Sequence, residues 1–179
     1  MDDRTLSAQL ADPKTQRSAF EYMVRQHSER LYWIIRRIVI SHEDANDLLQ
    51  NTFLKAWTSL DKFKGESKVN SWLSSIAINE SLDFLRRNKH MTFASTDEDM
   101  AVANNLMADP YFDGSRTEAL LQQAIATLPE VQRLVFQMRY FDDMKYSEIS
   151  RLLGTSEGAL KASYHHAVNK IAEFFHTHD

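Results

Sequence analysis

The chain has 179 residues, of which 43% are hydrophobic and 26% charged, so it can bury the core of one larger or two smaller globular domains. It contains no cysteine, which excludes disulfides and thiolate metal sites and suits a reducing compartment. Its first residues are too polar for a signal peptide, and no apolar run approaches the roughly 20 residues of a membrane span. From these three observations we expect a cytoplasmic protein. Because the chain has only four glycines and three prolines but long segments of helical periodicity, we expect an all-α fold.

The net charge of −4 arises in the middle of the chain. Residues 88–115 contain one Lys or Arg against five Asp or Glu, whereas residues 1–87 have a balance of +1 and residues 116–179 a balance of −1. Because neither outer part is strongly basic, attraction to duplex DNA through phosphate neutralisation is expected to be weak for the chain alone. A DNA-binding function would therefore depend on a partner that brings the protein to DNA.

Three amphipathic helices are predicted in the first half of the chain. Ser41 and Asp44 fit a capping box at the start of the second helix, whose inner face we expect to include Phe53 and Trp57. A short basic loop, residues 62–68, leads into the third helix. From the spacing of their apolar residues, the three helices are predicted over residues 19–40, 41–60 and 69–87.

The helical period is lost over residues 91–114, which contain acidic residues and turn-forming pairs such as Asp109-Pro110 and Asp113-Gly114. We interpret this segment as an acidic linker between two small helical domains, residues 1–90 and 115–179.

Two further capping boxes follow the linker. The motif Ser115-Arg-Thr-Glu118 predicts a helix that ends near residue 126. The motif Thr127-Leu-Pro-Glu130 predicts a helix that reaches residue 141 and tolerates its proline in the first turn.

Residues 145–171 have the layout of a helix-turn-helix: a short helix, a turn at Gly154, and a second helix capped by Thr155 or Ser156. Glycine suits the turn because it adopts the left-handed conformation without steric cost. Polar and cationic side chains on the outward face of the second helix can meet base edges and phosphates. The alternative is an ordinary helical hairpin with a solvated polar face. The inner positions of the second helix are expected to be Leu160, Tyr164, Ala167, Val168 and Ile171.

The histidines near the C-terminus do not predict a metal site. His165 and His166 are adjacent on a helix and point about 100° apart, so one metal ion cannot easily bind both. His176 and His178 fit a frayed, solvated helix end. The sequence also has no glycine-rich phosphate loop, nucleophile elbow or His-Glu-x-x-His motif. We therefore expect no metal, no cofactor and no enzymatic activity.

Three segments, in this order, resemble the extracytoplasmic-function group of bacterial RNA polymerase sigma factors, the minimal two-domain type of the sigma-70 family. Residues 42–57 carry a Glu-Asp-Ala-x-Asp-Leu-x-Gln-x-x-Phe-x-x-x-Trp pattern, similar to the family's helix that binds core polymerase. Residues 60–87 are similar to the loop and helix that read and melt the minus-10 element. Residues 128–136, followed by the helix-turn-helix, are similar to the domain that reads the minus-35 element.

The resemblance implies a factor that binds core RNA polymerase and directs promoter-specific initiation. Residues 1–90 would be sigma region 2, and residues 115–179 would be sigma region 4. Its partners would be core RNA polymerase, promoter DNA as duplex and as melted strand, and an anti-sigma factor.

The residues implied for polymerase binding recur at helical spacing and combine acids, amides and one leucine. The alternative for such a stripe is a solvated helix face. The set is Asp44, Asp47, Gln50, Asn51 and Leu54.

The residues implied for the minus-10 element are cations for phosphates and polar side chains for an unstacked base. Phe63 or Trp72 would supply a wall for that base, with core packing as the alternative for both rings. Relatives often carry basic residues where Ile78 and Glu80 stand, so duplex contact along this helix is expected to be weaker. The set is Lys62, Lys64, Ser67, Lys68, Asn70, Ser75, Asn79 and Arg86.

The residues implied for the minus-35 element lie on the second helix of the helix-turn-helix. Ser163 and His166 replace two arginines that are usual in the family, so we expect this element to be read partly through DNA shape. The set is Lys161, Ser163, His165, His166 and Lys170.

Two other functions fit part of the sequence. A stand-alone regulator would use the same helix-turn-helix as a dimer on a palindrome, with a sensing or dimerising N-terminal half. Such a protein would have no use for the basic loop or for the stripe around Gln50. An adaptor that binds only protein would leave the polar face of residues 161–170 without a role.

Overall fold

The structure is a computed structural model that describes residues 1–39, 41–63, 65, 68–88, 108–112 and 114–178. These residues form helices and turns only, which confirms the expected all-α class. The chain divides into two compact units, residues 1–89 and 90–179, and each is described by itself. Most of the expected acidic linker, residues 91–107 and 113, lies outside the described residues.

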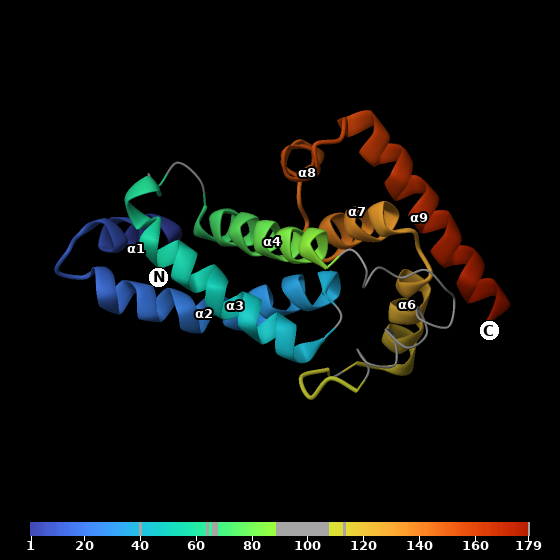
Figure 1. The fold of residues 1–179 in the computed structure, drawn as a ribbon, viewed down its shortest axis with the longest axis horizontal. Coiled ribbons are helices and arrows are strands. Elements are labelled where there is room, and N and C mark those ends of the chain that lie inside the picture. Colours follow the sequence, from blue (N-terminus) through green and yellow to red (C-terminus); the bar gives the residue numbers. More distant parts are fainter. Residues whose placement is uncertain (40, 64, 66–67, 89–107, 113, 179) are drawn as a thin grey trace. The chain divides into compact units, whose positions relative to one another are not determined.

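The first unit is built on three long helices that pack on one another in pairs (Figure 1). Their common core contains buried aliphatic side chains such as Leu31 and Ile35 from the first, Leu48 from the second and Leu73 from the third. A shorter helix precedes them, and a 3-10 turn follows α3. The elements are α1 (Asp3–Ala11), α2 (Gln16–Ile38), α3 (His42–Thr58), η1 (Leu60–Lys62) and α4 (Val69–Arg87).

The ends of these helices follow local chemistry. The Ser41 side chain caps α3 by accepting a hydrogen bond of 3.0 Å from the Asp44 backbone N–H, as its sequence predicts. The predicted bounds of α4 agree with the structure, whereas α2 begins three residues before Ala19. Sequence reasoning missed α1, a short helix that buries only Leu6 and Leu10. With so short an apolar pattern, α1 gives little periodicity to detect.

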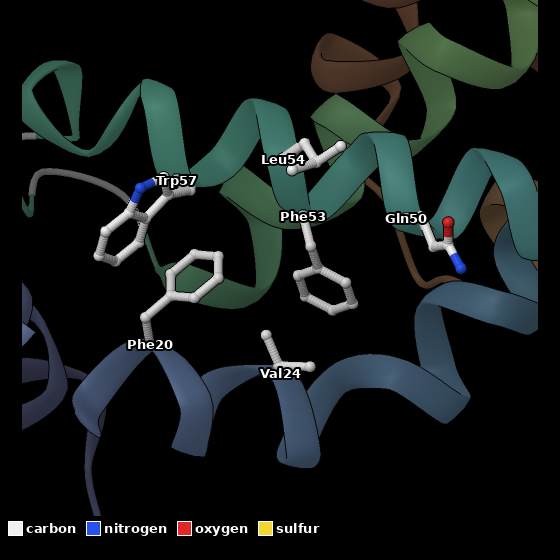
Figure 2. A pocket seen from close by; sticks show the side chains of 6 residues that line it. All are labelled: Phe20, Val24, Gln50, Phe53, Leu54 and Trp57. Atoms are coloured by element: carbon white, nitrogen blue, oxygen red, sulfur yellow. The ribbon is translucent and has the colours of Figure 1, made fainter. Parts of the chain in front are cut away.

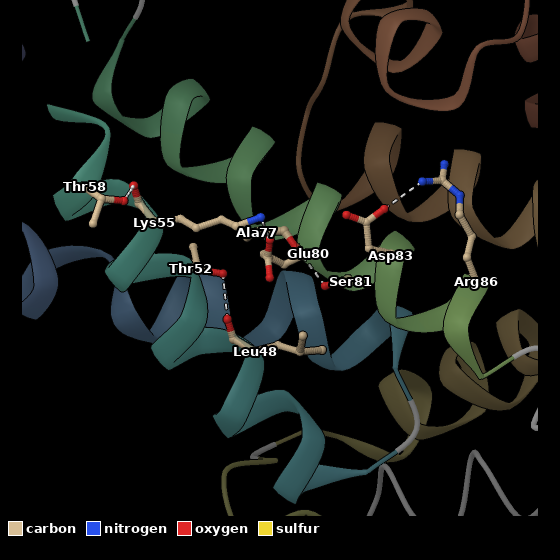
Figure 3. Close-up of polar contacts among 9 residues, drawn as sticks. All are labelled: Leu48, Thr52, Lys55, Thr58, Ala77, Glu80, Ser81, Asp83 and Arg86. Atoms are coloured by element: carbon tan, nitrogen blue, oxygen red, sulfur yellow. Dashed lines mark hydrogen bonds and ion pairs between the residues drawn. The ribbon is translucent and has the colours of Figure 1, made fainter. Parts of the chain in front are cut away.

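One side of α4 is packed against α3 (Figure 3). Ile78 is fully buried. The Glu80 side chain is 10% exposed, and its carboxylate forms an ion pair with the ammonium of Lys55, whose side chain is 61% exposed. Two buried hydroxyls near this contact are satisfied inside their own helices, since Thr52 donates to the Leu48 carbonyl and Ser81 to the Ala77 carbonyl. Ile78 and Glu80 therefore face the protein interior, where a DNA backbone cannot reach them.

In its described residues the second unit has four helices, and three of them, the first two and the last, contribute to a compact apolar cluster. Ala124, Ile125 and Phe136 form its centre together with Ala167 and Ile171 from the last helix. The elements are α6 (Arg116–Ala126), α7 (Glu130–Tyr140), α8 (Tyr146–Leu153) and α9 (Glu157–Thr177).

The two capping boxes expected in this unit have different outcomes. The Ser115 side chain accepts from the Glu118 backbone N–H at 3.3 Å, so the first is confirmed. The second is wrong, because Thr127 ends α6 and donates its hydroxyl to the Ala124 carbonyl, 2.6 Å away. Helix α7 instead begins after Pro129, which has no side chain able to accept a hydrogen bond.

The helix-turn-helix is formed by α8 and α9. Gly154 has a φ of 68°, the left-handed conformation that its sequence position predicts, and the Ser156 side chain caps α9. Leu160, Ala167 and Ile171 are buried as expected. The expectation for Val168 is wrong, because this side chain is 39% exposed. The buried stripe of α9 therefore consists of Leu160, Ala167 and Ile171 and is narrower than the sequence predicts.

None of the helices in the described ranges combines the length and the apolar character that a bilayer crossing requires.

Candidate protein and nucleic-acid interfaces

Helix α3 presents the expected mixed stripe to solvent. Asp47, Gln50 and Asn51 are exposed, and Asp44 is half-buried in the first turn. Leu54, in the last two turns of this helix, is 64% exposed and adds a large apolar side chain to the polar stripe. The spacing of these residues at three- and four-residue steps brings them onto one side of the helix.

Beside this stripe lies an open apolar groove between α2 and α3 (Figure 2). It has a volume of about 450 Å³. The expectation that Trp57 is a core residue is wrong, because its side chain is 41% exposed. The Phe20 ring packs edge-on against Trp57, with ring centroids 5.0 Å apart. The groove is lined by Phe20, Val24, Gln50, Phe53, Leu54 and Trp57.

The sequence predicted the residues of α3 at the rim of this groove but missed the residues of α2 that form its floor. Gln50 and Leu54 belong to the expected stripe, but Phe20 and Val24 come from another helix. Their i, i+4 spacing on α2 was the available signal, yet the same spacing is typical of any buried face. Apolar rings beside acid and amide side chains make a surface that fits an amphipathic helix with cationic residues.

The residues expected at the minus-10 element fall into several groups. Lys68, Ser75, Asn79 and Arg86 are separated by seven, four and seven residues and therefore lie along one side of α4. Asn70 is exposed but lies on a different side of the helix, about 200° around from Lys68.

These side chains differ in how open they are to a ligand. Lys68 and Asn79 are exposed, whereas Ser75 is half-buried and donates its hydroxyl to the Ser71 carbonyl at 2.9 Å. Arg86 is exposed and forms an ion pair with Asp83 at 2.9 Å. Such a surface pair is weak enough to exchange for a phosphate.

The connection before α4 carries Lys62, which is exposed in η1. Phe63 and Trp72 are both half-buried and stack with centroids 4.6 Å apart and planes at 28°. Each ring therefore packs against the other, and neither is fully buried. Lys64 and Ser67 lie outside the described residues.

The N-terminal end of α4 is tied to α2 by Arg30. Its guanidinium donates to the Ser74 hydroxyl at 2.7 Å and to the Asn70 carbonyl at 3.3 Å. Burial lowers the pKa of His27 on the same helix, the Arg30 charge lowers it further, and Asp3 opposes both effects. His27 is therefore neutral at neutral pH and adds nothing to the cationic surface.

Helix α9 exposes Lys161, His165, His166 and Lys170, whereas Ser163 is half-buried. These five residues do not share one line. Lys161 and His165 lie on one side of the exposed face, and Ser163, His166 and Lys170 lie toward the other side.

Sequence reasoning missed Asn169, which lies opposite the buried row of α9. Its amide Nδ2 lies 3.2 Å from His165 Nε2. An exposed amide in the middle of such a face is a natural partner for an adenine edge. Its position one turn after His165 was the signal that would have identified it.

Tyr146 on α8 links the two helices of the motif electrostatically. The Arg139 guanidinium lies 4.6 Å from the centre of its ring, and the Lys161 ammonium lies 5.8 Å from it. The negative face of the ring thus attracts both cations.

The rings of His165 and His166 are 6.1 Å apart, centre to centre. In the part of the chain that the structure describes, no three His, Asp or Glu side chains are placed to hold a metal ion.

Two family models match the chain: Sigma-70 region 2 over residues 23–91, and Sigma-70, region 4 over residues 118–171. The sequence is 30% identical over 156 residues to the ECF RNA polymerase sigma factor SigM of the Erdman strain of Mycobacterium tuberculosis, a match that covers 87% of this chain and 76% of that protein. It is 26% identical over 161 residues to the ECF RNA polymerase sigma factor SigW of Bacillus subtilis, over 85% of this chain and 86% of the relative.

A further relative, ECF RNA polymerase sigma factor SigE of Mycolicibacterium smegmatis, is 26% identical, and the match covers 89% of this chain but 63% of that longer protein. Among solved structures, CnrH in complex with the cytosolic domain of CnrY has the same fold, with a TM-score of 0.68, 24% identity and 99% of each chain covered. The sigma factor RpoE, solved with the anti-sigma factor NepR from Bartonella quintana, also has this fold, with a TM-score of 0.65, 22% identity and coverage of 87% of this chain and 96% of that one.

Proposed function

The chain belongs to the extracytoplasmic-function group of sigma-70 factors, which are non-enzymatic regulators of transcription, and from this premise we propose which surfaces bind core RNA polymerase and which bind promoter DNA. Residues 1–90 dock on the polymerase and open the minus-10 element, residues 115–179 bind the minus-35 element, and residues 91–114 connect them. The protein has no catalytic reaction of its own and acts in the cytoplasm, where the polymerase is.

Polymerase binding is assigned to the α3 stripe and the groove beside it. The observation that carries this assignment is the exposed Leu54 at the edge of an apolar groove. An apolar surface of this kind marks a site for a partner. The partner would place apolar side chains in the groove and cationic side chains against the acids and amides of the rim, which are Asp44, Asp47, Gln50 and Asn51.

Minus-10 binding is assigned to the polar side of α4 and to the connection before it. Opening a promoter requires cations that hold phosphates and polar groups that bind an unstacked base. The exposed Lys62 and Lys68, the polar row through Asn79 and the Arg86 guanidinium offer these groups. Lys64, Ser67, Asn70 and Ser75 complete the proposed set.

Minus-35 binding is assigned to the exposed face of α9. Lys161, His165 and Asn169 would meet base edges or phosphates in the major groove, with Ser163, His166 and Lys170 toward the backbone. The face contains no arginine, so fewer bidentate guanine contacts are available to it, and DNA shape carries part of the discrimination.

Regulation is assigned to an anti-sigma factor that competes for the polymerase-binding surface. The apolar groove supports this proposal, because a partner that covers Leu54 and Trp57 also blocks docking on the polymerase.

A reconstituted transcription assay tests the proposed function. Core polymerase of the same host, without any other initiation factor, is mixed with the protein and fragmented genomic DNA, and transcript starts are sequenced. Discrete starts that depend on the protein are expected. A footprint made by the protein alone, without any effect on start selection, would instead support the dimeric regulator.

The docking surface is tested separately with Leu54→Glu. A charge placed in the groove is expected to lower affinity for core polymerase by at least about tenfold, the ratio that corresponds to 1.4 kcal/mol. The matched control is Gln26→Glu, which adds the same charge at an exposed position of α2 outside the groove. Equal affinities of the two variants would contradict the assignment.

A further inference from the structure

Helix α1 lies outside the match to Sigma-70 region 2, which begins at residue 23, and contributes no residue to the surfaces assigned above. It is nevertheless firmly attached to the first unit. Leu6 and Leu10 are buried, and the Asp2 side chain caps the helix by accepting from the Thr5 backbone N–H at 2.7 Å. The turn into α2 is fixed as well, because the Gln16 amide donates to the Leu10 carbonyl at 2.9 Å.

This anchored helix contacts the connection between α3 and α4. Helix α1 lies against η1 as well as against α2. Ser7 faces Gly65, since a Cβ atom added at Gly65 would lie 3.7 Å from Ser7 Cβ and 4.0 Å from Ser7 Oγ. The gap between Gly65 and Ser7 would therefore accept one added carbon atom at ordinary van der Waals distance, and a much larger side chain at position 7 would press on Gly65.

The conformation of Gly65 restricts how the connection can respond. Its φ of 69° is in the left-handed region, which other residues adopt only with strain. The Ser7 hydroxyl donates to the Asp3 carbonyl in its own helix at 2.7 Å. Because this hydroxyl hydrogen is already bonded within α1, Ser7 and Gly65 are related by steric fit.

A second support comes from α4, because Phe63 stacks on Trp72. The turn itself is closed by the Lys62 and Phe63 backbone N–H groups, which donate to the Ser59 and Leu60 carbonyls at 3.0 and 3.1 Å. The connection that carries Lys62 is thus held by the Trp72 ring at one point and by α1 at another.

We propose that α1 is a positioning element for promoter melting: it fixes the position of η1 and Gly65, so that Lys62 meets the displaced DNA strand. This inference rests on the proposed sigma function. Its physical reason is that contacts to an unstacked base require accurate placement, and an error of about 1 Å in a binding group can cost a large factor in rate. Ser7 acts through Gly65 and touches no DNA.

The test enlarges residue 7 and leaves its neighbours unchanged. Ser7→Phe should displace the connection at Gly65, whereas Ala8→Phe places the same ring at an exposed position of α1 and serves as the matched control. Ser7→Ala removes only a hydroxyl that is bonded within α1 and should behave like the wild type. Ser7→Leu gives a smaller displacement and replaces Ser7→Phe in the comparison if the phenylalanine variant does not fold.

The measurement is formation of open complex by the full chain with core polymerase, on a duplex promoter and on the same promoter pre-melted over the minus-10 element. Ser7→Phe is expected to lower opening of the duplex by about tenfold relative to Ala8→Phe, with affinity for core polymerase unchanged. On the pre-melted promoter the two variants should agree within about twofold, because the step that needs an accurately placed connection has been bypassed.

Each other outcome overturns the inference. Equal opening of the duplex by Ser7→Phe and Ala8→Phe would show that α1 does not set the connection. An equal loss on both templates would show that α1 only stabilises the unit. If the wild-type protein starts no transcription from any promoter, the proposed function fails and the inference fails with it, a result distinct from an active wild type whose variants do not differ.

Discussion

The two helices proposed to meet DNA, α4 and α9, are of similar length but are built into their units very differently. Helix α4 buries eight residues, among them Ile78 and the charged Glu80, whereas α9 buries only Leu160, Ala167 and Ile171. Helix α4 is thus a core element with a narrow polar side. Helix α9 is a peripheral element that exposes most of its circumference.

This difference shows how much sequence change each surface tolerates. On α9, side chains can be exchanged with little effect on folding, so promoter preference can change independently of stability. On α4 a change at most positions alters the packing with α2 and α3. We therefore expect substitutions to separate binding from stability in the second unit and to couple them in the first.

The largest expected effect is that of Ile78→Ala. Because this side chain is fully buried between helices, its truncation should lower the free energy of unfolding by about 2–5 kcal/mol. Val168→Ala, at an exposed position of α9, should change stability by less than about 0.5 kcal/mol.

Urea denaturation measures both changes. All three tryptophans, Trp33, Trp57 and Trp72, lie in the first unit, so tryptophan fluorescence follows the unfolding of that unit alone. Amide resonances of the second unit follow Val168→Ala. Equal small losses for both variants would remove the contrast between the two helices.

The next effect concerns DNA binding by α9. Lys161→Ala and His165→Ala should each weaken binding of the upstream promoter element by about 1–3 kcal/mol, because each removes a contact to a base edge or a phosphate. Their melting temperatures should equal that of the wild type, since both side chains are exposed.

Binding is measured with core polymerase present and at several salt concentrations. If Lys161 contacts a phosphate, its loss should also make the plot of log affinity against log salt concentration less steep, by about one unit of slope, because one fewer counterion is released on binding. Lys14→Ala, at an exposed lysine of the first unit, is the matched control and should leave the affinity unchanged. A lowered melting temperature in either α9 variant would count against the peripheral role of this helix.

The smallest effect is that of the ion pair between Lys55 and Glu80, which joins α3 to α4. A double-mutant cycle with Lys55→Ala and Glu80→Gln should give a coupling free energy of about 1 kcal/mol, since the Glu80 side chain is buried but the Lys55 side chain is mostly exposed to water. The same cycle on Asp83 and Arg86, an exposed pair on α4, should give about 0.5 kcal/mol or less.

Both cycles use fluorescence-detected urea unfolding of the first unit. A coupling at the Lys55 pair no larger than that at the Asp83 pair would show that the inner side of α4 is held by apolar packing alone.

Features that depend on a few neighbouring residues were predictable. Ser41 and Ser115 cap helices where the sequence places them, and Gly154 turns the chain between the two helices of the motif. The predicted ends of α4 are also correct. In each case groups only a few residues apart in the chain decide the structure, so distant parts of the chain have little influence.

The errors occur where local signals compete. Thr127 has the right residue type to cap α7, but its hydroxyl bonds backward to α6. Trp57 and Val168 have the apolar character of core residues, yet the nearest helices leave them partly exposed. The apolar stripe of these helices is wider than the surface that the neighbouring helices cover. Only the packing of the helices decides which apolar side chains at the border of the stripe stay exposed to water.

Apart from α1, the sequence by itself determined the helices that the structure describes, their order, the turn at Gly154 and most polar residues of α3, α4 and α9, because hydrophobic periodicity and capping act over one or two helical turns. Only the tertiary structure decided that α2 and α3 enclose a groove floored by Phe20 and Val24, that Glu80 pairs with Lys55, and that α1 lies under Gly65. These contacts join residues about 25 to 60 positions apart, and their geometry depends on how whole helices pack.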